Sequence, residues 1–331
     1  MLTNYLKIAW RNLWKNKIFS SINIVGLTIG LTCCMLMVIY LKHELSYDNF
    51  QEKGDRTVRV IMEYGMSGEV SKGNYTSTKV APAFKQNFPE IEAAVRMSQG
   101  TKIVKFEDKL LTEKRFLYAD STFLNIFSFK VLKGNSQFAL AGPNKVLLTE
   151  STANRYFGNA DPLGKIIFVS SNALPYEVTG VIEDCPSNSQ IKFDFLASFS
   201  SLGPAQEQTY WNANYTTYFL LKSPEAIPTL QAKIPGFMKK EMGAELSGKD
   251  YVSYILEPFK SVHLYSEYEG FEPNSSITYV YIVSAIALLI LAIACFTYVN
   301  LSTARSMERA KEVGIRKVSG ALKNQIFRRR L

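Results

Sequence analysis

Two long apolar segments without a charged residue constrain this chain more than any other feature. The first is Ile18–Leu41, bounded by Lys17 and Lys42, and the second is the almost wholly apolar run Ile277–Leu301. A helix rises 1.5 Å per residue, so the 24 residues of the first run extend roughly 36 Å, enough to cross about 30 Å of hydrocarbon. We therefore predict two transmembrane helices, at 18–41 and 277–303.

A cleaved signal peptide is the alternative for the first segment. The uncharged run is longer than the roughly 7–15 apolar residues of a signal peptide, and no small-x-small cleavage site follows it. The sequence that follows is Lys42-His43-Glu44-Leu45. The pattern favours an anchor that stays attached.

The charge of the chain is concentrated at its two ends. The net charge is +9, but residues 1–40 contain four basic residues and no acidic one, and residues 277–331 contain nine basic and two acidic ones, which leaves the middle slightly acidic. Basic flanks stay on the cytoplasmic side of a membrane. We expect both termini in the cytoplasm and residues 42–276 on the outer side. We expect no nucleic-acid binding, because the folded middle carries no basic excess.

The first 17 residues predict an amphipathic helix that lies in the cytoplasmic interface, an elbow ahead of the first span. Apolar residues recur at helical spacing from Leu2 to Leu13, and basic residues lie opposite them. The expected anchoring side chains are Lys7, Trp10, Arg11, Trp14 and Lys15. The alternative is a charged flank without an interfacial face.

Within the first span, Gly26 and Gly30 form a G-x-x-x-G motif. Small residues at this spacing let two helices approach closely. The motif predicts a helix-packing face, although such spacing also arises by chance in apolar segments.

The middle of the chain predicts an α+β domain, with two lobes as one arrangement, because short alternating patterns are interleaved with short helical ones. The predicted strands are 56–63, 145–149, 176–183, 215–221 and 251–256, and the predicted helices are 80–88, 150–157 and 229–242.

No catalytic or metal site is evident in the sequence. The only histidines are His43 and His263, and the one cysteine of the outer domain is Cys185. Residues 158–165 (Gly-Asn-Ala-Asp-Pro-Leu-Gly-Lys) resemble a P-loop, but the glycine spacing is one residue too long and Ile166 replaces the magnesium-binding hydroxyl. We expect a turn there, no ATPase activity and no cofactor.

The segment after the second span is basic and helical in pattern. Glu312 and Arg316 form a favourable i,i+4 pair, and Arg309 lies on the same face. Gly314 disfavours a helix interior by about 1 kcal/mol, so we expect a bend there. The segment fits docking on a cytoplasmic partner as well as it fits a solvated flank.

Several stretches resemble FtsX/MacB-type ABC transporter permeases. They are Ala9–Lys17 and Ser21–Gly30 at the start, Asp55-Arg56, Phe123–Phe129, Asn144–Thr149, Tyr156–Lys165, Tyr176–Asp184, Phe193–Phe195 and His263–Ser266 in the middle, and Asn300–Ala321 at the end. Any one motif is weak evidence, but their order and spacing together are specific. The resemblance covers essentially the whole chain.

The resemblance implies a MacB-like periplasmic core domain at 42–276, with an inserted lobe at roughly 114–213, followed by a coupling helix within 304–331. The implied ATPase-coupling residues are Arg309, Glu312, Gly314, Arg316 and Lys317. The implied location is the bacterial inner membrane, and ATP and magnesium would be bound by a separate cytoplasmic ATPase. A second permease copy or a paralogue, a periplasmic adaptor and the lipid membrane are the other implied partners.

The implied function is mechanotransmission, in which ATP hydrolysis by the ATPase changes the periplasmic conformation for efflux or for release of lipoproteins or peptides. Family members continue to further spans, so we expect this chain to be truncated, split or a fragment. The alternatives are a two-span sensor with a periplasmic ligand-binding domain, which lacks an output module within 304–331, and a tethered hydrolase, which lacks a catalytic constellation.

Overall fold

The computed structural model describes residues 11, 14, 17–170, 172–246 and 248–320. It separates into two units, one formed by the two terminal helical regions and one formed by Ser46–Ser276. Each unit is described by itself below.

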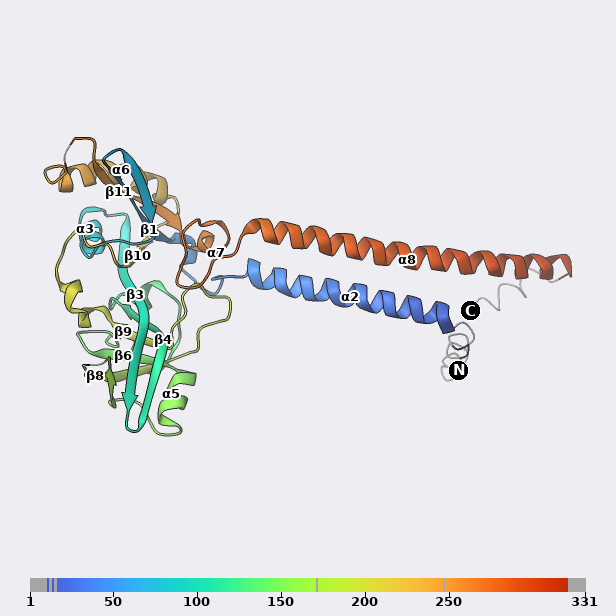
Figure 1. Ribbon diagram of the computed structural model, residues 1–331, viewed down its shortest axis with the longest axis horizontal. Helices are drawn as coiled ribbons and strands as arrows, with labels where there is room; N and C mark the ends of the chain where they lie inside the picture. Colours follow the sequence, from blue (N-terminus) through green and yellow to red (C-terminus); the bar gives the residue numbers. More distant parts are fainter. Residues whose placement is uncertain (1–10, 12–13, 15–16, 171, 247, 321–331) are drawn as a thin grey trace. The chain divides into compact units, whose positions relative to one another are not determined.

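The first unit contains two long helices, α2 (Lys17–Leu45) and α8 (Ile277–Val318), which lie side by side in Figure 1. Both carry a stretch long and apolar enough to span a membrane, Ser20–Leu45 and Ile277–Asn300. Both apolar stretches were predicted from the sequence. The predicted bend is not a break, because α8 stays helical through Gly314 to Val318. One glycine costs only about 1 kcal/mol, which the helical residues on either side offset.

The second unit is an α+β domain built on one eleven-stranded sheet with the order β11-β1-β10-β3-β4-β9-β6-β8-β5. The β2 strand pairs with β1, and β7 pairs with β3 and β8. The strands are β1 (Thr57–Met66), β2 (Glu69–Gly73), β3 (Ile91–Phe106), β4 (Lys109–Ala119), β5 (Val131–Gly134), β6 (Lys145–Thr149), β7 (Ile166–Val169), β8 (Leu174–Ile182), β9 (Phe195–Ser198), β10 (Thr216–Leu221) and β11 (Tyr251–Pro258).

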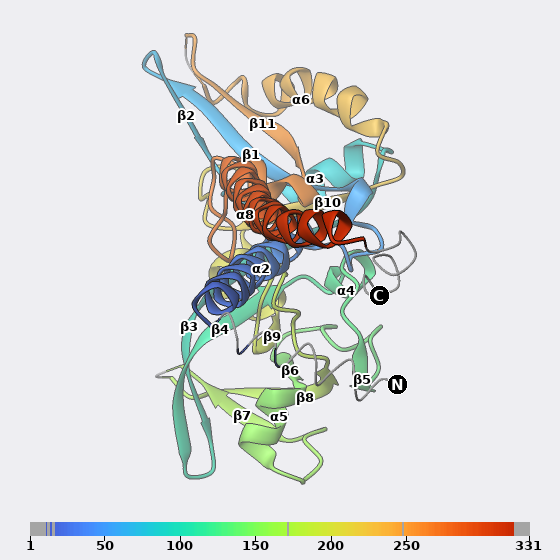
Figure 2. The same cartoon turned by 90° about the vertical axis from the view of Figure 1, so that its right-hand side faces the viewer.

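Five α-helices belong to the described part of this domain. They are α3 (Val80–Asn87), α4 (Phe123–Ile126), α5 (Glu150–Phe157), α6 (Ala226–Met242) and α7 (Val262–Tyr265), and four short 3₁₀ turns accompany them. In Figure 2, α6 lies with β1, β2 and β11 at one end of the sheet, and α5 lies with β7 and β8 at the other end.

Three apolar cores hold the domain together. The first packs α3 and α6 on β1, β10 and β11, for example through Phe84, Phe219 and Ile234. The second lies around α4 and the aromatic side chains that follow it. The third packs α5 on β4, β6, β8 and β9, around Phe116 and Tyr156. The two ends of the sheet therefore have separate cores, which is why the domain forms two lobes.

The chain topology links these lobes. The β1, β10 and β11 strands pair at one end, while the segment between β4 and β10 supplies β5 to β9 at the other. Residue 114, the predicted start of the inserted lobe, lies inside β4, which pairs with β3 from Lys109 to Ala119. This long β3–β4 hairpin spans both lobes, so residue 114 is not a break in the chain's secondary structure.

Candidate functional site

The residues that adjoin the membrane helices form a polar junction at the base of the domain. Three segments meet there: the first connector (46–51), which follows α2; the junction loop (188–190), between β8 and β9; and the second connector (266–276), which precedes α8. Because the junction loop belongs to the inserted part of the chain, it brings a distant segment to both connectors.

Asp48 attaches the first connector to the junction loop. Its carboxylate accepts hydrogen bonds from the backbone N–H of Gln190 at 3.0 Å and from the Ser189 hydroxyl at 3.2 Å, and its own N–H donates to the Asn188 carbonyl. The side chain of Asn188 donates back to Ser46 at 2.9 Å. The two segments are therefore joined by both main-chain and side-chain bonds.

The carboxyl of Asp48 lies in an unusual electrostatic environment. Asp48 is 1% exposed, and this burial raises the pKa of its carboxyl to about 6. The hydrogen bonds from Gln190 and Ser189 and the charge of Lys192 oppose the rise, because each favours the ionised form. The junction thus contains a group that changes charge in mildly acidic conditions.

Gln190 attaches the junction loop to the second connector. Its side chain is fully buried, donates to Asn274 at 2.7 Å and accepts from the N–H of Glu272 at 3.2 Å. A Cβ atom at Gly270 would lie 2.8 Å from the Gln190 side chain, so only glycine permits this approach. A buried polar side chain with both ends bonded fixes its neighbours.

Arg59 on β1 anchors the second connector to the sheet. Its side chain is fully buried and donates to the carbonyls of Tyr268 and Glu269 and to the Ser266 hydroxyl, at 2.7–3.1 Å. It also forms an ion pair with Glu257 of β11, at 2.7 Å. The guanidinium therefore holds one strand pair and one connector in a single arrangement.

Sequence reasoning missed this junction. Arg59 alternates with Val58 and Val60 along β1, so a half-buried strand would leave its side chain in solvent, yet Arg59 and Ile61 are both buried. The one available signal was a charged residue between two valines, near the start of the strand. Nothing in the sequence spacing pairs Asp48 with Gln190, which lie 142 positions apart.

The membrane-helix pair contains the predicted G-x-x-x-G motif, and its two glycines have different surroundings. Gly30 is buried, and a Cβ atom there would lie 3.2 Å from Cβ of Ala294 on α8. Gly26 has open space at the same position and lines a groove of about 450 Å³ between α2 and α8. A further contact, from the Cys34 thiol to the Ala287 carbonyl at 3.5 Å, confirms that the helices run antiparallel.

Of the predicted interfacial residues, Lys7, Trp10 and Lys15 lie outside the described residues. Arg11 and Trp14 are helical and exposed, and the Lys17 ammonium lies 4.4 Å from the centre of the Trp14 ring. The elbow itself stays a prediction.

The predicted coupling residues all belong to α8. Gly314 is exposed on this helix. The side chains of Arg309, Glu312, Arg316 and Lys317 lie outside the described part of the structure. Their role in coupling stays a prediction.

The P-loop-like segment is a turn, as predicted. The N–H of Gly164 donates to the Val178 carbonyl at 2.8 Å, and Lys165 accepts from Val178 at 2.9 Å. Its backbone groups are therefore used by β8. Among the described residues, no three His, Cys, Asp or Glu side chains gather in a group that could hold a metal ion.

Comparison with known proteins agrees with this architecture. Residues 20–237 match the family described as the MacB-like periplasmic core domain. The chain belongs to this family. It is an FtsX/MacB-type ABC transporter permease, an inner-membrane protein with a periplasmic domain.

The macrolide export ATP-binding/permease protein MacB of Vibrio parahaemolyticus is 20% identical over 98% of this chain. The chain spans about half of that relative, 48% of its length. A solved domain of a putative permease protein from Porphyromonas gingivalis is 25% identical, with a TM-score of 0.54 over 63% of this chain and 91% of that one. The periplasmic region of MacB from Actinobacillus actinomycetemcomitans is 16% identical over 60% and 88% of the two chains, with a TM-score of 0.41.

Proposed function

We propose that this permease transmits mechanical work from a cytoplasmic ATPase to its periplasmic domain. The observation that carries the proposal is the continuity of α8, one helix of 42 residues from Ile277 to Val318. At 1.5 Å per residue it extends about 63 Å, roughly twice the thickness of the hydrocarbon core. A helix that enters the membrane at one end therefore also supplies the segment expected to dock on the ATPase.

Continuity matters because an α-helix resists bending. Each residue from the span into the coupling segment stays within the same hydrogen-bonded ladder, so a push at one end displaces the whole element. In its spanning part α8 packs on α2 through Gly30 and Ala294. The displacement is thereby shared between the two helices.

The junction supplies the next step in the proposed path. The second connector continues directly into α8, and the first connector follows α2. Both connectors are bonded to the junction loop, which belongs to the other lobe of the sheet. Movement of either helix would therefore act on both lobes rather than on one.

In this proposal the permease binds no nucleotide, and ATP and magnesium belong to the ATPase, a partner subunit or a fused domain like the ATP-binding part in the name of the Vibrio relative. Both termini are cytoplasmic, and a second permease copy completes the assembly. The work drives efflux, or release of a lipoprotein or peptide, in concert with a periplasmic adaptor.

The test measures docking and coupling separately, with this chain in nanodiscs and a purified candidate ATPase subunit. Glu312→Lys and Arg316→Glu should each weaken binding of the ATPase at least tenfold. Lys311→Glu is the matched charge-reversal control, because Lys311 is not among the predicted coupling residues. This variant should bind the ATPase normally.

The Gly314→Pro variant should bind the ATPase normally but no longer stimulate its ATP hydrolysis, because proline interrupts the helix. Gly314→Ala is its control and should keep stimulation. Normal binding by both Glu312→Lys and Arg316→Glu would overturn the docking role, and normal stimulation by Gly314→Pro would overturn the role of helix continuity.

A further inference from the structure

The longest strand of the periplasmic domain has a gap in its pairing. On one side β3 pairs with β4 from Met97 to Phe106, but on the other side its partner changes. The β10 strand pairs with β3 only as far as Thr216 opposite Met97, and β7 begins at Val169 opposite Val104. The nearest bond between them is from Ser170 to the Ile103 carbonyl. Residues 98–102 therefore have no strand on this side within the described part of the chain.

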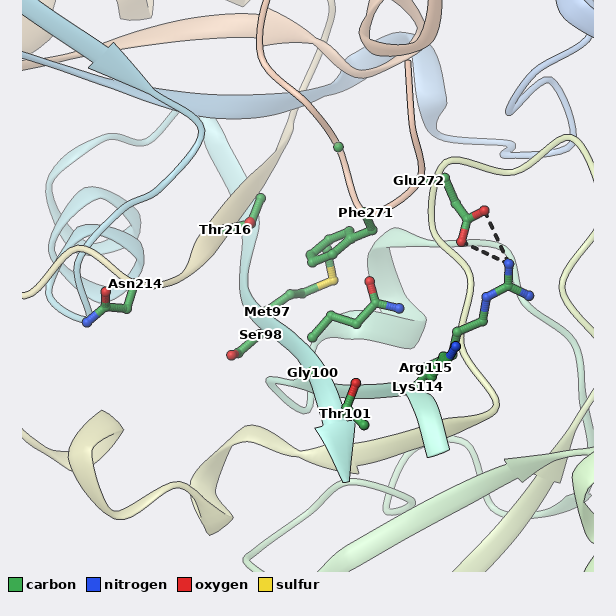
Figure 3. Close-up of a pocket in the computed structure, with 12 residues that line it drawn as sticks. Met97, Ser98, Gly100, Thr101, Lys114, Arg115, Asn214, Thr216, Phe271 and Glu272 are labelled. Atoms are coloured by element: carbon green, nitrogen blue, oxygen red, sulfur yellow. Dashed lines mark hydrogen bonds and ion pairs between the residues drawn. The ribbon is translucent and has the colours of Figure 1, made fainter. Parts of the chain in front are cut away.

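A cavity of about 500 Å³ lies at this gap. Five consecutive residues of β3, Met97–Thr101, line it, together with Asn214 and Thr216 from the start of β10. Lining by five consecutive residues shows that the backbone of β3 borders the cavity, and Figure 3 shows Ser98 and Thr101 along this strand, with Asn214 across the space. Lys114 and Arg115 of β4 and residues 270–272 of the second connector also line the cavity, so it extends from the unpaired side of β3 over the β3–β4 pair.

Gly100 keeps this space open. A Cβ atom there would meet nothing within 4 Å, and the backbone angle of Gly100 does not require glycine. The pairing register of β3 with β4 also shifts between Gly100 and Lys102. Phe116 lies opposite Gly100 and Glu113 opposite Lys102, so the extra residue of this bulge lies in β4. A bulge bends its strand and disrupts regular pairing, and bulges are common next to functional sites.

The charges around the cavity are mostly positive. Its lining carries Lys114 and Arg115 against one carboxylate, Glu272, which Arg115 and Lys192 both contact at 3.2–3.4 Å. Lys114 forms no ion pair within the described residues. Figure 3 shows the Arg115–Glu272 pair on one side of the cavity. An occupant with a negative side chain would meet Lys114 without displacing this pair.

We propose that this gap in β3 binds an extended, acidic segment of a partner polypeptide, which adds as a short strand between β7 and β10. Main-chain hydrogen bonds provide affinity in this mode of recognition, and adjacent side-chain pockets provide specificity. The five unpaired residues extend about 16 Å and accommodate a segment of similar length. Because β7 and β10 are both antiparallel to β3, the added strand is antiparallel as well.

The experiment measures fluorescence anisotropy of a labelled hexapeptide, Thr-Val-Glu-Val-Glu-Thr, with the full chain in nanodiscs. The same peptide with alternate backbone nitrogens methylated cannot pair as a strand on that edge, and we expect it to bind at least tenfold more weakly. A peptide with lysine in place of glutamate should also bind several-fold more weakly.

Two variants test the location. Gly100→Leu fills the cavity and should raise the dissociation constant at least tenfold, whereas Gly236→Leu, at an open glycine on α6, should leave it unchanged. Lys114→Glu alters an exposed side chain and should weaken the acidic peptide while strengthening the lysine peptide.

Three results would overturn the inference. The first is that the methylated peptide binds as tightly as the unmethylated one, and the second is that binding is unchanged in both Gly100→Leu and Lys114→Glu. The third is that no peptide binds at millimolar concentration, because main-chain pairing tolerates most sequences. Peptide binding that appears only when two copies of the chain dissociate would assign the gap to a second copy instead. Binding should need neither ATP nor an intact coupling segment, so Glu312→Lys separates this inference from the proposed function.

Discussion

The two units of this protein use the same apolar residue types in opposite ways. In the periplasmic domain Val58, Phe116 and Leu147 are fully buried, whereas Leu36 on α2 and Leu288 on α8 are 62% and 68% exposed within their unit. A soluble fold does not leave such surfaces in water, but lipid is as apolar as leucine and does not drive these side chains inward. The domain carries its own cores, and the helix pair depends on the membrane and on packing of small residues.

Rigidity has a different source in each unit. The helix pair has the close Gly30–Ala294 approach and an adjacent open groove. The domain has three apolar cores and, next to the connectors, a buried polar junction. We therefore expect substitutions at the junction to change the unfolding free energy more than substitutions between the helices.

The largest expected effect is that of Arg59→Met. Removing the buried guanidinium leaves Glu257 and the carbonyls of Tyr268 and Glu269 without their partner, so the domain should lose about 3–5 kcal/mol of unfolding free energy. The measurement is urea unfolding in detergent, followed by the fluorescence of Trp211, the one tryptophan outside the first 17 residues. Lys72→Ala, which removes a partly exposed ion pair with Glu63, is the control and should leave the unfolding free energy nearly unchanged, because solvent screens such a pair. Equal losses would contradict the anchoring role of Arg59.

A smaller effect is expected from Asp48→Asn, and it depends on pH. The native carboxyl keeps its proton up to a pKa of about 6, while the unfolded one releases it near 3.8. The contribution of the Asp48 carboxyl to the unfolding free energy of the wild type is therefore fully present below about pH 4. It is lost as the pH rises to about 6, and it stays lost at higher pH. Asparagine cannot ionise. Between pH 4 and 7 the variant should gain up to about 3 kcal/mol relative to wild type.

Unfolding curves at several pH values check this prediction. Asp161→Asn, at a carboxylate whose side chain is 64% exposed, measures how much of the effect comes from net charge alone. A constant difference between Asp48→Asn and wild type across pH 4–7 would show that burial of Asp48 does not control its ionisation.

The smallest effect concerns the helix pair, where Gly30→Leu should weaken packing by about 1–2 kcal/mol because its Cβ meets Ala294 at 3.2 Å. Oxidative cross-linking of Cys34 to a cysteine introduced by Ala287→Cys reports the pairing, in a background with Cys33→Ser and Cys295→Ser. Cross-linking should fall several-fold with Gly30→Leu and stay unchanged with Gly26→Leu. If both substitutions act alike, the two glycines do not have separate roles.

Much of the secondary structure could be predicted from local pattern. The helix at 150–157 and the strand at 145–149 agree with α5 and β6 residue for residue, and α3, β8 and β10 agree to within two residues at each end. In these elements one face is apolar and the ends carry clear stop signals, such as Gly158. Local pattern and tertiary environment then favour the same structure.

The β3–β4 hairpin could not be predicted in the same way. Its first strand is 16 residues long, contains Arg96, Lys102 and Lys105, and crosses from one core to another. The face that each residue presents changes along the strand, and a bulge in its partner strand β4 shifts the register between Gly100 and Lys102. No single period describes such a segment.

Local sequence is sufficient to predict the two apolar spans and, in the described part of the domain, five of the eleven strands and three of the five α-helices, because these depend on residues that are neighbours along the chain. The tertiary structure alone decided the burial of Arg59, the pairing of Asp48 with the junction loop and the gap beside β3. These features depend on which distant segments meet, and on charge and hydrogen-bond partners that no local spacing encodes. Spans follow from local hydrophobicity, whereas sites follow from contacts between remote residues.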